Sequence, residues 1–241
     1  MEARVNGGET WIVSKQAAWK LSYQDKEVKV IRELRGGREL LGGVQAINPV
    51  TGALLYVLPA SFVDDDTGTG GIVYSVPAHA PFDYVALMDL ARIDDEFGRI
   101  ARAISPVGII RVEGYGGEWP AADIVGRMGG IHSQEERGKL EEATKAIYRD
   151  EYYSGVMRDN TPFPGVKVSE AKERVIQLLR EKGAWDVMYE TEPRLIYTRG
   201  GWEQGYRGGD KGSMVPELRS PRVEAQDTRG AGVHEDNPKL V

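Results

Sequence analysis

Residues 68–83, GTGGIVYSVPAHAPFD, combine three features that could build the rim of an active site. The glycines allow backbone conformations and close approaches that other residues forbid. The β-branched residues after them predict a strand over residues 71–76, which the prolines at 77 and 81 end. Asp83 comes directly before apolar residues at helical spacing, so we expect it to cap a helix. The segment would then present a carboxylate at the end of a rigid strand; the alternative is that Asp83 serves only as a cap.

His79 lies in the same segment, and its side chain has the chemistry of a general base. A packed histidine is the alternative interpretation. His132 and His234 show no ligand spacing with it, so we expect no metal site. The three consecutive aspartates at 64–66 favour a solvated turn over a cation site. The glycine-rich turn lacks both the P-loop lysine and the full dinucleotide-binding spacing, so nucleotide binding is not expected there.

The elements around this segment follow an α+β pattern. The sequence predicts a helix near residues 15–23, another after Asp83, and a turn at residues 48–52. β-Branched and aromatic residues predict strands over residues 10–13, 28–31, 53–58, 71–76 and 109–112.

The following part of the chain is more helical. Ser133 and Glu136 have the spacing of a capping box, which predicts a helix that extends to about residue 152. A second helix is expected from Ser169 to a C-terminal stop at Gly183. Strands are predicted over residues 185–189 and 194–198. We therefore divide the chain into residues 1–112, residues 113–199 and a tail over residues 200–241.

Composition excludes several classes of function. The chain has 241 residues, 41% hydrophobic content and no cysteine, so it has enough apolar residues for a core but no disulfide, thiolate zinc site or cysteine nucleophile. It contains no apolar run of membrane-spanning length and no signal peptide, which predicts a cytoplasmic protein that does not contact a membrane. The net charge of −6 does not favour nucleic acid over the chain as a whole, although a local basic patch remains compatible with it.

Several ordered segments resemble the leucyl-tRNA synthetases of archaea and eukaryotes. The segment VPAHAPFD at residues 76–83 is similar to the core motif of their editing domain, the connective peptide. Residues 10–24 (TWIVSKQAAWKLSYQ), 58–64 (LPASFVD) and 133–155 resemble neighbouring parts of the same domain. The resemblance runs from about residue 8 to about residue 199, and its several separated matches make it specific.

The resemblance implies a mixed β-barrel with helices packed around it. It also implies a hydrolytic activity. Such a domain hydrolyses the ester of a misattached amino acid, such as norvaline, isoleucine or methionine, at the 3′ end of tRNA(Leu). Asp83 would anchor the substrate's ammonium group, because a carboxylate pairs with a cation. His79 is a second catalytic candidate because of its side-chain chemistry. By family analogy four residues would line the pocket: Thr69, Tyr74, Val76 and Ala78.

The resemblance also sets expectations about what the chain does not do. The family's TxRPET-type segment, which helps to form the pocket floor, does not occur in the sequence, nor do the HIGH-type and KMSKS-type signatures. We therefore expect a fragment with an incomplete editing domain, separated from the catalytic domain that uses ATP and magnesium, with no cofactor of its own. The alternatives are a free-standing trans-editing deacylase and a noncatalytic tRNA-binding or decayed remnant.

The tail from about residue 200 has a different character. Apolar residues become sparse and no helical or strand period survives, which is typical of a disordered segment. A one-base shift with permissible synonymous codons converts residues 206–218 into IVVVIKDQWFLN, which resembles the family's next segment. We therefore predict a frameshift near residues 200–203, which the coding DNA would test directly.

Overall fold

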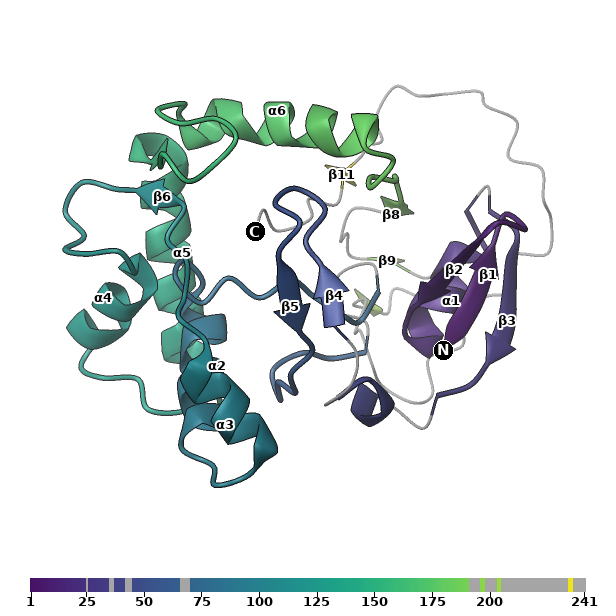
Figure 1. Ribbon diagram of the computed structural model, residues 1–241, viewed down its shortest axis with the longest axis horizontal. Coiled ribbons are helices and arrows are strands. Elements are labelled where there is room, and N and C mark those ends of the chain that lie inside the picture. Colours follow the sequence, from purple (N-terminus) through teal and green to yellow (C-terminus); the bar gives the residue numbers. More distant parts are fainter. Residues whose placement is uncertain are drawn as a thin grey trace. The chain divides into compact units, whose positions relative to one another are not determined.

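The computed structural model describes residues 1–24, 26–34, 37–41, 45–65 and 70–190. It also describes the backbone of three two-residue strands at 196–197, 203–204 and 234–235. The chain divides into two compact units, which we describe separately (Figure 1). The first consists of Met1–Arg32, Asp65–Ile72 and Val187–Pro238, and the second of Glu33–Asp64, Val73–Asp186 and Lys239–Val241.

The first unit contains a three-stranded antiparallel sheet with one short helix. The strand order is β2-β1-β3, with β1 at Glu2–Val5, β2 at Glu9–Ile12 and β3 at Val28–Arg32. Helix α1 covers Lys15–Leu21. Alternate residues of β1 turn inward, which buries Ala3 and Val5. The predicted strands near residues 10–13 and 28–31 and the predicted helix near residues 15–23 are confirmed.

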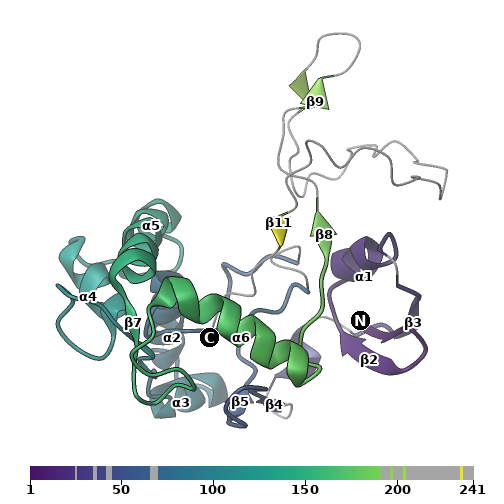
Figure 2. The same ribbon diagram turned by 90° about the horizontal axis from the view of Figure 1, so that it is seen from above.

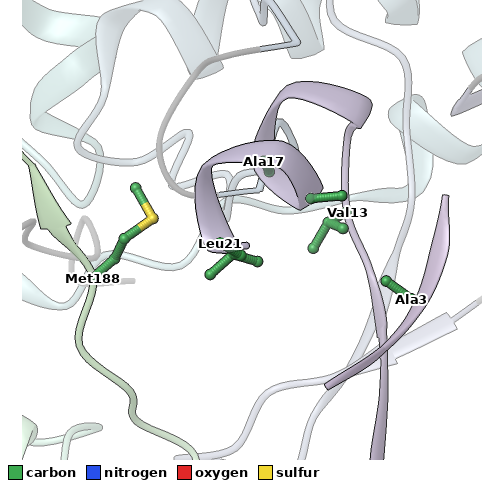
Figure 3. Packing of buried hydrophobic residues seen from close by; sticks show 6 residues of the cluster. Ala3, Val13, Ala17, Leu21 and Met188 are labelled. Atoms are coloured by element: carbon green, nitrogen blue, oxygen red, sulfur yellow. The ribbon is translucent and has the colours of Figure 1, made fainter. Parts of the chain in front are cut away.

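Small and branched side chains form the core of this unit. Ala3 from β1, Val13, residues from α1 and Met188 are buried together (Figure 3). The helix begins at a side-chain cap, because Ser14 Oγ accepts the N–H of Ala17 at 2.9 Å. The chain returns to this cap at Gly70, whose carbonyl accepts the N–H of Ser14 at 2.8 Å. The glycine-rich turn therefore supports the start of α1.

The second unit is mainly helical. Figures 1 and 2 show α4 and α5 beside α2, with α3 following α2. One core, which includes Val85, Val125, Leu140 and Ala143, joins α2, α4 and α5. Its described residues form α2 at Pro81–Ala91, α3 at Glu96–Ala103, α4 at Pro120–Arg127, α5 at Arg137–Ser154 and α6 at Val168–Glu181. Helix α6 ends before Gly183, whose φ of 65° matches the predicted C-terminal stop.

The strands of the second unit are short pairs. Strands β4 (Gln45–Ile47) and β5 (Leu54–Tyr56) form a hairpin, and β6 (Ile110–Arg111) pairs with β7 (Val156–Met157). A short 3-10 helix, η1, covers Gly37–Leu40. The predicted turn at residues 48–52 is confirmed: Asn48 Oδ1 accepts two backbone N–H groups and Gly52 has a φ of 75°.

The fold class is mixed α and β. Within the residues that the structure describes, the sheets have two or three strands and none closes into a barrel. Strand β8 (Tyr189–Glu190) pairs with β11 (His234–Glu235), and β9 (Ile196–Tyr197) pairs with β10 (Glu203–Gln204). Apart from β10 and β11, the predicted tail over residues 200–241 lies outside the described residues. Across the described part of the chain, no helix has both the length and the apolar character needed to cross a bilayer.

Three local predictions are wrong. Residues 71–76 form no strand, and of the strand predicted at residues 185–189 only Tyr189 belongs to one. Helix α5 begins at Arg137, and Ser133 does not cap it. The carboxylate of Glu136 instead accepts the N–H of His132 at 2.8 Å and pairs with Lys139 at 2.6 Å, while Ser133 Oγ accepts the N–H of Glu135, which precedes the helix.

Candidate functional site

The predicted site lies where helix α2 begins. Pro81 occupies the first turn, since its fixed φ suits a helix and its missing N–H costs nothing there. The N-cap is Ala80, which makes no side-chain capping bond. Asp83 is therefore inside the first turn, and the prediction that it is the N-cap is wrong. An acidic residue in this turn is favoured by the helix dipole.

The Asp83 carboxylate closes a turn that precedes the helix. Its Oδ2 accepts the N–H of Val76 at 2.7 Å. The carbonyl of Val76 in turn accepts the N–H groups of His79 at 2.9 Å and Ala80 at 2.8 Å. Asp83 is only 6% exposed, so its charge lies in a poorly solvated environment. The site therefore has a buried carboxylate that is oriented by a hydrogen bond from the Val76 backbone.

His79 is packed inside the protein, at 4% exposure. Its Nδ1 lies 2.6 Å from Glu151 Oε1, and its Nε2 accepts the N–H of Ile109 at 2.8 Å and that of Ile110 at 3.3 Å. Because two backbone donors face Nε2, the ring proton is assigned to Nδ1, which donates to Glu151. Both ring nitrogens are thus engaged in hydrogen bonds within the protein.

Glu151 was not identified from the sequence. It lies on α5, where it follows Leu140, Ala143 and Ile147 on the buried face and is itself 4% exposed. Burial raises the pKa of the Glu151 carboxyl, and the bond to His79 partly offsets this increase. The sequence signal that could have identified Glu151 is its place on the helix, because the spacing of the buried residues predicts an apolar side chain at this position.

Tyr148 is a second polar residue of α5 that sequence analysis missed. Burial, together with the charges of Asp83 and Glu151, raises the pKa of its phenol well above the usual range. The phenol therefore keeps its proton near the buried carboxylates. Thr144 lies one turn earlier, and its Oγ1 is buried without a hydrogen-bond partner in the part of the chain that the structure describes. Thr144, Tyr148 and Glu151 have the spacing of a single helix face.

The residues predicted to line a pocket have different environments. Val76 is half-buried and bonded to Asp83, whereas Tyr74 is 41% exposed. Ala78 is 1% exposed, and its carbonyl accepts the N–H of Ala121 from α4 at 3.0 Å. Thr69 lies outside the described residues. The structure thus brings Val76 and His79 together with Asp83 and buries Ala78 in packing.

The described residues contain no cluster of three or more histidine, aspartate or glutamate side chains that could hold a metal ion. Asp64, from the aspartate run at residues 64–66, forms an ion pair with Arg137 at 3.9 Å. The chemistry that this geometry supports is recognition of a cation by the Asp83 carboxylate.

Comparison with known sequences finds close relatives. A leucine–tRNA ligase from Pyrococcus furiosus is 46% identical over 210 residues, which cover 83% of this chain and 21% of the relative. The leucine–tRNA ligase from Methanocaldococcus jannaschii is 44% identical over 192 residues, with 79% of this chain and 19% of the relative covered. The chain thus spans about one fifth of the length of the curated relatives that it matches. No family model matches the sequence.

Solved structures agree with these relatives. The crystal structure of GlLeuRS-CP1 superposes with a TM-score of 0.65 at 27% identity, over 79% of this chain and 74% of that one. The editing domain of the Plasmodium falciparum cytosolic leucyl-tRNA synthetase has the same fold, with a TM-score of 0.61 at 18% identity over 72% of this chain and 59% of that domain. The fold described above is therefore that of these domains.

Proposed function

Since the chain is a homologue of the leucine–tRNA ligases, we propose that it carries the part of such an enzyme that removes wrongly attached amino acids from tRNA(Leu). The reaction is hydrolysis of the ester between the amino acid and the tRNA 3′ end. The observation that carries the proposal is the buried Asp83 carboxylate, held by the N–H of Val76 in a chain whose structural neighbours are editing domains.

In the proposed mechanism, Asp83 anchors the substrate's α-ammonium group. A charge-assisted hydrogen bond to a poorly solvated carboxylate fixes the position of the adjacent ester. Water adds to the ester carbonyl, the bond to the ribose oxygen breaks, and the products are the free amino acid and the tRNA 3′ hydroxyl. A ribose hydroxyl of the substrate helps to position the water. His79 takes no proton in this scheme, because both of its ring nitrogens are engaged.

Pocket walls would supply the specificity. Editing is needed because one methylene in an apolar pocket discriminates weakly between amino acids. We propose that Thr69, Tyr74 and Val76 contribute to the wall that accepts norvaline, isoleucine or methionine and excludes leucine. Ala78 would contribute by supporting that wall, since it is packed against α4. We also propose that the mixed β-barrel expected from the sequence is the scaffold that carries this pocket wall.

The partner would be the aminoacylated 3′ end of tRNA(Leu), and the location the cytoplasm. Aminoacylation, with its ATP and magnesium, would belong to the parts of the relatives outside the matched fifth. The proposed hydrolysis uses only side chains, backbone groups and water, so we assign it no cofactor.

The test is deacylation of tRNA(Leu) charged with norvaline or with leucine. The proposal predicts release of norvaline above the rate without protein, with leucyl-tRNA(Leu) released more slowly. Binding of tRNA without release would indicate the noncatalytic alternative. Repeated turnover by the 241-residue chain alone would favour the trans-editing alternative, because hydrolysis would then need no catalytic domain. Equal release with and without protein would contradict hydrolysis by this chain.

A further inference from the structure

The His79–Glu151 pair joins three segments that are distant in sequence. His79 precedes α2, Glu151 belongs to α5, and Ile109 and Ile110 lie at the start of β6. Both residues of the pair are 4% exposed, so neither side chain is accessible to a substrate. A buried glutamate carries a desolvation cost, so its presence requires a compensating role.

The hydrogen bonds of this pair have only one consistent proton arrangement. If Nε2 carried the proton, it would face the N–H groups of Ile109 and Ile110 as a third donor, and both backbone groups would lose their acceptor. The proton therefore resides on Nδ1, and an acceptor at Glu151 selects this tautomer. Glu151 Oε1 lies 2.6 Å from Nδ1 and thus determines which nitrogen of the His79 ring donates and which accepts.

The backbone of His79 belongs to the turn that fixes Asp83. The backbone N–H groups of His79 and Ala80 both donate to the carbonyl of Val76, and the N–H of Val76 donates to Asp83. A displaced His79 would disturb the bond from its backbone N–H to the Val76 carbonyl and so shift Val76, the residue whose N–H orients the Asp83 carboxylate. Tyr148 connects the same elements electrostatically, since both Asp83 and Glu151 raise its pKa.

We propose that Glu151 is a positioning residue for Asp83, which acts by holding His79 as the Nδ1–H tautomer and thereby fixing the turn at residues 76–80. The expected change in kcat rests on the proposed function, whereas the expected change in the turn at residues 76–80 does not depend on any substrate. The pair acts as a fixed support: His79 and Glu151 contact neither substrate nor water in the reaction.

The decisive comparison is Glu151→Gln with Glu151→Leu. Glutamine keeps a carbonyl acceptor for Nδ1–H, whereas leucine has a similar volume and no acceptor. We expect kcat for norvalyl-tRNA(Leu) to fall by about tenfold or more in the leucine variant, because small misplacements of a catalytic group have large kinetic effects. KM should change less than about threefold, since most contacts with the tRNA remain, and the glutamine variant should recover most of kcat.

A matched pair of substitutions at His79 tests the direction of the bonds. In His79→Asn the amide nitrogen can replace Nδ1 and donate to Glu151. In His79→Gln the amide oxygen can replace Nε2 and accept from Ile109. Both variants should retain part of the activity that His79→Leu loses. Equal losses in all three would contradict the assignment of donor and acceptor roles.

A destabilising control separates positioning from general loss of stability. Leu140 is fully buried on the same helix, eleven residues from Glu151, which corresponds to about 16 Å along α5. Leu140→Ala should lower the melting temperature, yet leave kcat within about threefold when assayed well below that temperature. A kcat loss equal to that of Glu151→Leu would show that instability alone explains the effect.

Two NMR measurements decide the structural part even if the wild-type chain hydrolyses nothing. Imidazole ¹⁵N shifts should show a protonated Nδ1 and an unprotonated Nε2 in the wild type and in Glu151→Gln. Hydrogen exchange of the Val76 and Ile109 amides should accelerate by about tenfold or more in Glu151→Leu, relative to amides of α6. Failure of deacylation with these shifts present would overturn the proposed function only. An Nε2–H tautomer, or unchanged exchange in Glu151→Leu, would overturn the positioning role.

Discussion

The carboxylate of Asp83 accepts the backbone N–H of Val76 at 2.7 Å, across a seven-residue separation in the chain. This bond connects the first turn of α2 to the start of the preceding turn. It also leaves the carboxylate charge buried, where an ammonium group would interact with it more strongly than in water. The bond to Val76 stabilises the local fold, and the same carboxylate is the group that we propose binds the substrate's ammonium.

Gly71→Ala should destabilise the first unit. Gly71 has a φ of 66°, and a Cβ there would lie 2.7 Å from the carbonyl oxygen of Asp65 and 2.8 Å from the Cβ of Ser14. We expect a loss of about 1–3 kcal/mol in the free energy of unfolding, measured by urea denaturation. Gly8→Ala is the control, because its Cβ would have no neighbour within 4 Å. Equal stability of the two variants would contradict this packing.

Glu136→Gln should have an effect that depends on pH. The ion pair with Lys139 and the bond from the His132 N–H lower the pKa of Glu136 to about 2. A pKa that is lower in the folded state stabilises the protein above the unfolded value of 4.5, and this contribution is lost as the pH falls towards 2. The melting temperature of the variant should therefore lie below that of the wild type at neutral pH and converge with it near pH 2. A constant difference across this range would refute the assignment.

Glu151→Gln should show the opposite pH trend. Burial raises the pKa of Glu151, so its ionisation costs stability as the pH rises above the ordinary value of 4.5. The glutamine variant has no such ionisation, so its melting temperature should rise relative to that of the wild type as the pH increases above 4.5. His79, Tyr148 and Tyr115 interact electrostatically with Glu151 and remain in both proteins. Glu141→Gln, an exposed change on the same helix, provides the control for net charge.

The sequence predicted the elements whose signals are local, whereas strands β1, β4 and β7 were not predicted. Residues 10–13 and 28–31 have β-branched strand character, and the helix near residues 15–23 starts at a serine that caps it. Helices α3 and α4 were missed. Helix α3 has eight residues with only a short apolar face, and α4 begins at Pro120, a residue that also ends elements.

The site was only partly predictable, for a physical reason. Asp83 and His79 could be singled out as candidates because they lie in one contiguous motif, whereas Glu151 is 72 residues from His79 and meets it only through a tertiary contact. The N-cap prediction for Asp83 failed because Pro81 starts the helix two residues earlier. No single-sequence signal specifies that the carboxylate turns back to Val76.

A substrate without its ammonium group shows whether Asp83 binds that group. Norvalyl-tRNA(Leu) and N-acetylnorvalyl-tRNA(Leu) differ in the charge that Asp83 should recognise, and Asp83→Asn removes the opposite charge while keeping an acceptor for the Val76 N–H. In the wild type, kcat/KM for the free amine should exceed that for the acetylated substrate by at least about tenfold, as expected for a hydrogen bond between charged groups. In Asp83→Asn this ratio should fall to about one. An unchanged ratio in the variant would show that Asp83 does not anchor the ammonium group.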